Sequence, residues 1–261
     1  MQISDGSSDN KRSSVRVMTW NIHGARTMMG RPDLSRVIEL VRKHSPDIVA
    51  LQEVDARRCG DAQAFDTLAS SLGTHRAEAR MLVAPEGDYG HVLVTRWPIS
   101  FSARHDISVA RREPRAALEA IIATPAGPLR TIAVHLGLSL RERHRQAHQL
   151  ASIAVAKSLP LVMLGDFNDW FWHGSVQYAL RELFPGRSRF RTFPAACPIL
   201  RLDRIYVRPQ RMLVRMCVDR DARTASDHLP VIADLDIAPT ANIDSGSAGE
   251  VATSISSGHR S

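Results

Sequence analysis

Acidic, amide and histidine side chains stand at the ends of several apolar stretches of this 261-residue chain. The stretch LVMLGDFNDW (161–170) begins with four apolar residues and ends with Asp166, Asn168 and Asp169. The same change from apolar to polar occurs in WNIHG, LQEVD, VHLG, LRLD and SDHLP, which carry Asn21, Glu53, His135, Asp203, Asp227 and His228. Buried charges are costly unless they are paired or metal-bound. Carboxylate and amide oxygens suit a hard cation, and histidine adds proton transfer.

Two parts of the chain share the order strand, helix, strand, and these elements must position the polar residues. The expected units cover 15–22, 33–44 and 47–54, and then 129–136, 140–158 and 161–167. Pro46 and Pro160 end the two helices, and Ser139 with Glu142 forms a capping box before the second. We therefore expect two similar sheet halves that face each other, with the helices outside and the polar strand ends in one crevice.

Five further apolar stretches are expected as strands. They cover 91–100, 117–125, 202–207, 212–218 and 229–236. No linker rich in glycine and serine interrupts 15–237, so we expect one domain there. The ends, 1–14 and 238–261, are poor in apolar residues, and we expect both to be disordered tails.

The composition favours a soluble protein of the reducing cytoplasm. No apolar run approaches the ~18 residues of a membrane span, and the N-terminus lacks the apolar core of a secretory signal. The three cysteines, Cys59, Cys197 and Cys217, fit neither a disulfide framework nor a zinc site.

The net charge is +7, and 31 of the 34 basic residues are arginine. A basic surface attracts phosphate esters, including nucleic acids and anionic lipid headgroups. The alternative is that the arginines are solvated on helix faces, because no single basic block dominates the sequence.

Seven motifs in order resemble the endonuclease/exonuclease/phosphatase family, which includes deoxyribonuclease I, inositol polyphosphate phosphatases and neutral sphingomyelinases. They are TWNIHG, ALQEVD, HVLVTRWPI, AVHLGLS, LGDFNDW, LRLDRIYV and ASDHLPV, and they cover about 15–236. The segment TFPAACPILRLDRIYV looks closest to small bacterial members whose substrate is poorly defined. The resemblance implies a deoxyribonuclease I-like fold, a four-layer α/β/β/α sandwich with two facing mixed β-sheets.

The resemblance also implies a Mg²⁺ site, with Mn²⁺ as a substitute, and hydrolysis of a phosphoester by an in-line attack of water. Glu53, Asn21 and Asp227 would hold the metal region. Carried over in the same way, the catalytic residues would be His228 oriented by Asp203, Asp166 for the nucleophile or the leaving oxygen, Asn168 on a phosphate oxygen, and His135 as phosphate ligand or acid.

Arginine and histidine positions near these motifs need separate interpretation. Arg115 is a candidate phosphate ligand, whereas Arg96 is expected to anchor a loop and Arg204 to point away from Asp203. His91 stands where many relatives carry asparagine, and is expected either to replace it as a donor or to alter substrate choice. RAAL replaces the common RGAL after Arg115. His23 is expected to be structural or peripheral.

Three functions remain open at this point. The first is a Mg²⁺-dependent phosphodiesterase that acts on nucleic acid. The second is a phosphohydrolase that acts on a lipid headgroup or a small phosphoester. The third is a catalytically silent binding module, which the presence of every expected catalytic group disfavours. We expect the protein to be a monomer. The aromatic loop WFWHGS (170–175) is expected to stack bases, contact lipid or pack on itself.

Overall fold

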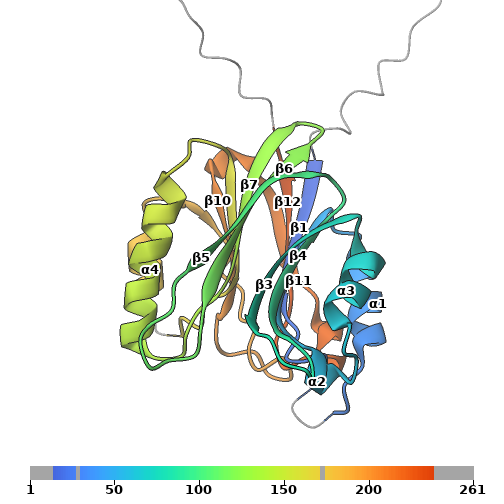
Figure 1. Ribbon diagram of the computed structural model, residues 1–261. Coiled ribbons are helices and arrows are strands. Elements are labelled where there is room, and N and C mark those ends of the chain that lie inside the picture. The colour runs from blue at the N-terminus through green and yellow to red at the C-terminus, as the bar shows by residue number, and fades with distance from the viewer. Residues whose placement is uncertain (1–13, 28–29, 171–173, 238–261) are drawn as a thin grey trace, which may run out of the picture.

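A computed structural model describes residues 14–27, 30–170 and 174–237 (Figure 1). The expected tails, 1–14 and 238–261, lie outside the described residues except for Ser14, which begins the first strand. Among the described residues, no helix is long and apolar enough to cross a membrane.

Two six-stranded mixed sheets form the centre of the molecule. The first has the order β11 (Leu213–Val218), β12 (Val231–Asp236), β1 (Ser14–Asn21), β2 (Ile48–Asp55), β4 (Tyr89–Thr95) and β3 (His75–Leu82). The second has the order β5 (Ile99–Asp106), β6 (Ala116–Thr124), β7 (Gly127–His135), β8 (Leu161–Asp166), β10 (Asp203–Arg208) and β9 (Gly186–Arg187).

The expected pair of strand–helix–strand units is confirmed. β1 and β2 are parallel and joined through α1 (Leu34–His44), and β7 and β8 are parallel and joined through α4 (Leu140–Val155). Asp33 and Ser139 cap these helices, because each side chain accepts a hydrogen bond from a backbone amide of the first turn. The remaining helices are α2 (Ala56–Cys59), α3 (Ala64–Leu72), α5 (Ser175–Leu180) and the 3₁₀ turns η1 (Gln210–Met212) and η2 (Arg220–Thr224).

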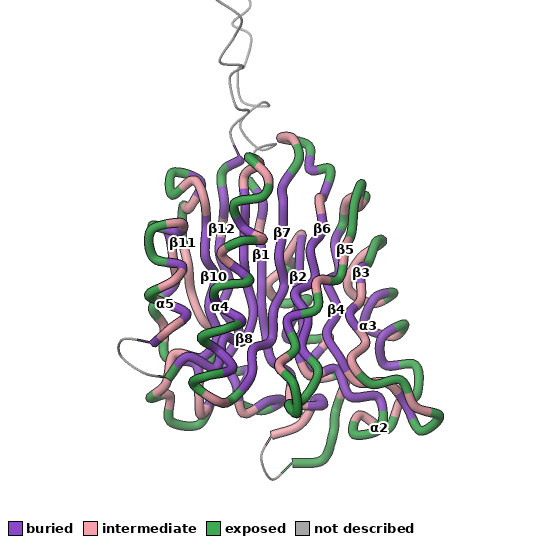
Figure 2. Tube along the Cα trace, turned by 60° about the vertical axis from the view of Figure 1, so that its left-hand side comes forward, coloured by how far each residue is buried: buried purple, intermediate pink, exposed green. Residues whose placement is uncertain are grey.

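Four layers follow from three separate apolar clusters. Side chains of both sheets, among them Val17, Leu93 and Leu164, form the central cluster between them. A second cluster packs α1 and α3 on the outer face of the first sheet, and a third packs α4 and α5 on the outer face of the second. The helices lie on opposite sides of the paired sheets in Figure 1, and the strands are mostly buried in Figure 2. The expected α/β/β/α sandwich is confirmed.

One expected strand, 91–100, is wrong because the chain changes sheets within it. β4 ends at Thr95 in the first sheet, and β5 begins at Ile99 in the second. Arg96 lies in the crossing, where its Nη1 atom is 3.1 Å from Asp47 Oδ1, as expected of a loop anchor. Only Thr95 and Arg96 separate the apolar run VLV from WPI, so periodicity alone does not reveal the crossing.

Candidate active site

Three polar residues stand side by side at one end of the second sheet. In the strand register, Asp166 is opposite His135 on the parallel strand β7 and opposite Asp203 on the antiparallel strand β10. Gly165 permits this arrangement, because its φ is +148° and a Cβ there would collide with the carbonyl oxygen of Val134. The backbone of LGDF therefore sets Asp166 between two other strand ends.

The first sheet contributes Asn21 and Glu53. Glu53 lies where the β2–β4 register shifts, and its φ of +53° is uncommon for a residue with a side chain. Asn21 Nδ2 donates to Glu53 Oε1 and to Asp166 Oδ2, each at 2.9 Å. These two bonds join the polar ends of both sheets.

His228 enters from the loop before β12. Its Nδ1 atom lies 2.8 Å from Asp203 Oδ2, so the proton on Nδ1 is held there and Nε2 is left for the cleft. Ser226 positions the loop, because its hydroxyl donates to the Asn21 carbonyl and accepts from the His228 amide. Burial alone lowers the pKa of His228, but the charge and hydrogen bond of Asp203 outweigh it and raise the pKa above its ordinary value.

His135 is held in the opposite protonation state. Arg115 Nη1 donates to His135 Nδ1 at 3.0 Å, so the ring proton of neutral His135 lies on Nε2. That atom is 3.6 Å from Glu53 Oε1 and 3.7 Å from Asp166 Oδ2. Burial, with the nearby Arg115 charge, lowers the pKa of His135 well below its ordinary value. The site thus pairs a cationic His228 with a neutral His135.

The carboxylates of the site also differ in their environment. Burial and the charge of Asp203 raise the pKa of Asp166, which accepts from the Asn168 amide at 2.8 Å. Burial acts to raise the pKa of Glu53 as well, but hydrogen bonds from His23 and Asn21 lower it overall. Asn168 has a φ of +49° and donates through Nδ2 to the Leu136 carbonyl.

The donor set fits a hard cation beside Glu53. Asp227 Oδ1 is buried with no hydrogen-bond partner, and it lies 3.9 Å from His23 Nδ1. The same nitrogen lies 3.3 Å from Glu53 Oε2. Two carboxylates and the Asn21 amide oxygen are therefore available to a hard metal ion such as Mg²⁺ or Mn²⁺. The His23 imidazole would join them once Nδ1 gives up the proton that it donates to Glu53.

A second group of potential ligands consists of Asp166, Asp203 and His228, whose ligand atoms lie within 4.8 Å of one another. Since His228 Nδ1 donates to Asp203, that nitrogen has no lone pair for a metal. The Glu53 side of the site is the better fit.

The polar residues surround a cleft of about 440 Å³. Seven of the residues selected from sequence line it: Glu53, Arg115, His135, Asp166, Asn168, Asp227 and His228. Asn21 and Asp203 support it from behind through the contacts given above. His91 does not line it. Burial lowers the pKa of His91 to about 4, and its Nε2 atom has no hydrogen-bond partner.

Sequence reasoning missed several cleft residues, among them His23, Tyr89 and Phe193. His23 was expected to be structural or peripheral, yet it reaches Glu53 because it and Ala25 adopt positive φ and turn the loop inward. Tyr89 lines the cleft, and Phe193 packs its ring 4.8 Å from that of His228. The histidine in WNIHG was a usable signal for His23. Phe193 lies in the segment TFPAACPILRLDRIYV, but no local pattern there marks it as a cleft residue.

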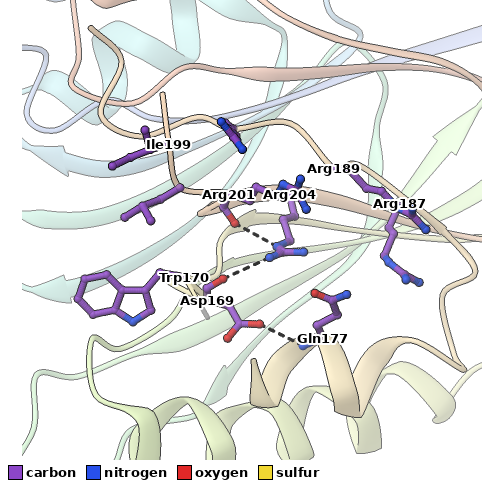
Figure 3. Close-up of a pocket in the computed structure, with 10 residues that line it drawn as sticks. Asp169, Trp170, Gln177, Arg187, Arg189, Ile199, Arg201 and Arg204 are labelled. Atoms are coloured by element: carbon purple, nitrogen blue, oxygen red, sulfur yellow. Dashed lines mark hydrogen bonds between the residues drawn. The ribbon is translucent and has the colours of Figure 1, made fainter. Parts of the chain in front are cut away.

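A separate pocket of about 340 Å³ adjoins the cleft, and Trp170 lines both (Figure 3). Arg204 faces this pocket and donates to the carbonyls of Arg201 and Asp169, so it points away from Asp203 as expected. Of the loop WFWHGS, 171–173 lie outside the described residues.

Comparison with known proteins gives one family. The model of the endonuclease/exonuclease/phosphatase family matches residues 18–228. The chain is 36% identical over 247 residues to the uncharacterized protein YbhP of Escherichia coli K12, covering 85% of this chain and 96% of that protein. The YbhP protein of Shigella flexneri matches to the same extent.

Solved structures share the fold at lower identity. An endonuclease/exonuclease/phosphatase from Beutenbergia cavernae has a TM-score of 0.70 at 22% identity, covering 87% of this chain and 72% of that one. A mannosyl-6-phosphatase from Bacteroides thetaiotaomicron has a TM-score of 0.64 at 17% identity, covering 85% of this chain and 99% of that one.

Proposed function

The chain belongs to the endonuclease/exonuclease/phosphatase family, and from that premise we propose that it is a Mg²⁺-dependent phosphodiesterase of one catalytic domain, 15–237. The observation that carries the proposal is the row His135–Asp166–Asp203 on the second sheet, joined through Asn21 to Glu53 on the first. Members of this family are typically hydrolases that act on phosphoester bonds.

The proposed division of labour follows from the hydrogen bonds. Glu53, Asn21 and Asp227, with His23, would hold the metal ion, which when bound supplies positive charge to the phosphate oxygens. His228, fixed by Asp203, presents Nε2 to a nonbridging oxygen of the phosphate. A charged donor at that point stabilises the extra negative charge that develops there.

Asp166 is the proposed acceptor for the proton of the attacking water. Its two oxygens are fixed by the Asn21 side chain and the Asn168 amide, so its position in the cleft is defined. As the water oxygen bonds to phosphorus and the ester bond breaks, neutral His135 keeps its proton and donates a hydrogen bond through Nε2–H to the leaving oxygen or to the phosphate. Arg115 keeps His135 in the tautomer that this requires. The leaving oxygen departs as an anion and takes its proton from solvent.

The test is hydrolysis of bis-p-nitrophenyl phosphate against p-nitrophenyl phosphate, with Mg²⁺, Mn²⁺ or EDTA. We expect metal-dependent cleavage of the diester, and a loss in His228→Ala of about 10²–10⁴ in kcat. His44→Ala is the matched control, because His44 is also paired with an aspartate, at 2.7 Å from Asp219, but does not line the cleft.

Three outcomes would contradict the proposal. Cleavage in EDTA would show that hydrolysis needs no metal ion. Full activity of His228→Ala would show that His228 is not the hydrogen-bond donor assigned here. Preference for the monoester would make the protein a phosphatase.

A further inference from the structure

Large apolar side chains are exposed at the cleft and at two further pockets. Of the ten exposed large hydrophobic residues in the described chain, six line the cleft, the adjoining arginine-lined pocket or a hollow between α4 and α5: Leu82, Leu138, Leu140, Trp170, Tyr178 and Ile199. Leu138 is 64% exposed and Tyr178 is 70% exposed. Apolar groups gathered in this way mark contact with a partner or a membrane.

The pocket beside the cleft is strongly basic (Figure 3). Its lining includes five arginines, and we name it the arginine pocket: Arg187, Arg189, Arg191, Arg201 and Arg204. Three of them alternate in the extended segment RSRFRT, where Ser188 and Thr192 are buried and Phe190 packs against the central core. Alternation therefore sends the three arginines to the other face, about 7 Å apart.

Three of these five arginines form no ion pair with any described carboxylate. Among the described residues, no carboxylate forms an ion pair with Arg187, Arg189 or Arg191, whereas other surface arginines such as Arg76 and Arg80 are paired. Asp169 lines the pocket, but it is buried and accepts from the Gln177 amide. Asp169 is a counter-charge for Arg204, but three like charges held together without ion pairs favour the binding of an anion, and guanidinium groups suit phosphate in particular.

We propose that the cleft end of the protein docks on an anionic phospholipid surface. The docking surface lies beside the site of the proposed hydrolase function and goes beyond that function. Trp170, 49% exposed, forms a wall of both pockets. One headgroup phosphate can therefore occupy the cleft while the phosphate of a neighbouring lipid occupies the arginine pocket.

The mixture of aliphatic and basic groups distinguishes a membrane from nucleic acid. Interfaces with nucleic acid are polar and basic, and an aromatic ring such as Trp170 can stack on a base. Exposed Leu138, Leu140 and Ile199 have no such role there. At a bilayer, apolar side chains enter the interface while arginines bind the anionic headgroups, and the two contributions add.

Co-sedimentation with vesicles tests the docking without turnover, in EDTA. We expect the full chain to bind vesicles containing phosphatidylglycerol, and to bind pure phosphatidylcholine much less. The double variant Arg189→Glu/Arg191→Glu should bind at least about tenfold more weakly. Arg211→Glu is the charge control, because Arg211 is exposed in η1 beyond the opposite end of β10.

The apolar contribution has its own matched pair on one helix. Leu140 and Val155 are 50% and 57% exposed, at the cleft end and the far end of α4. Leu140→Ser should weaken vesicle binding about threefold or more, and Val155→Ser should not. Because Leu140 and the arginines lie on different elements, a folding failure in one variant leaves the other test intact.

Several results would overturn the docking surface. These are no vesicle binding by the wild type, equal losses in the control variants, or arginine-dependent binding of a single-stranded oligonucleotide without vesicle binding, which would assign the pocket to nucleic acid. The hydrolase proposal fails separately, because it is judged on the soluble diester and not on vesicle binding.

Discussion

Two buried clusters of charge in this molecule have opposite characters. In the Glu119 cluster, beneath the end of α4, the carboxylate of Glu119 accepts from Arg130 Nε, Lys157 Nζ and His105 Nε2 at 2.7–2.8 Å. Arg130 also donates to the carbonyls of Ile153 and Ala154 and so holds the end of that helix. Every charged group there has a partner.

In the cleft cluster, carboxylates outnumber the groups that neutralise them. Asp166 and Asp203 adjoin one another across paired strands, and His228 is the cation they share. Asp203 Oδ1 and Asp227 Oδ1 are buried without hydrogen-bond partners. The Glu119 cluster is arranged for stability. The cleft cluster keeps unsatisfied carboxylate oxygens that can bind a cation.

The largest effect is expected for Asp203→Asn, which should lower activity without lowering stability. The variant should lose about 10²–10⁴ in kcat on the diester, because His228 loses the carboxylate that orients and charges it. Its melting temperature should stay the same or rise, since the repulsion with Asp166 is removed. The matched change is Asp219→Asn, in the remote pair with His44, which should leave kcat unchanged. A large drop in melting temperature for Asp203→Asn would show that the cleft cluster also serves stability, and would contradict the contrast between the two clusters.

Glu119→Gln is expected to lower stability without changing activity. Removing one partner of a buried ion pair leaves Arg130, which is fully buried, without its counter-charge and costs about 3 kcal/mol of unfolding free energy. Urea unfolding measures this loss, and kcat should not change. Glu39→Gln, in an exposed pair with Arg36, should cost less than about 1 kcal/mol. Equal losses of unfolding free energy for the two variants would show that burial does not strengthen the Glu119 ion pair.

Acid should remove the advantage of the Glu119 cluster. Burial acts to raise the pKa of Glu119, but hydrogen bonds from Arg130, Lys157 and His105 lower it to about 2. Since the folded-state pKa is below the unfolded value of about 4.5, the stabilisation is present above pH ~4.5 and is lost as the pH falls toward 2. The difference in unfolding free energy between wild type and Glu119→Gln should therefore narrow over that range. A constant difference from pH 7 to pH 2.5 would contradict the assignment.

The smallest effect is expected for His23→Ala at the edge of the cleft cluster. Loss of one nitrogen ligand should weaken Mn²⁺ binding by about tenfold, and Mg²⁺ binding less, because imidazole favours the transition metal. Isothermal titration calorimetry measures both affinities. His75→Ala, an exposed histidine whose ring contacts Thr74, is the control. Equal losses for the two metals would mean that His23 is not a ligand.

The positions of most strands and of the polar residues at their ends were predictable from sequence, whereas β3, β5 and β9 were not expected as separate strands. The apolar runs before Asn21, Asp166 and Asp203 are strands that end near those residues, because a buried strand in a two-layered sheet is apolar throughout. The caps at Asp33 and Ser139 lie on the expected helix starts. The exchange of sheets after Thr95 was not predictable, since both sheets contribute to one apolar core.

By itself, the sequence determined which residue types stand at the strand ends, because period, caps and prolines are local signals. Tertiary structure decided which of them meet. It placed Arg115 on His135, brought His23 to Glu53 through a left-handed turn, and left His91 outside the cleft lining. Such contacts depend on how two sheets pack and where a loop turns, and no local pattern records these distances.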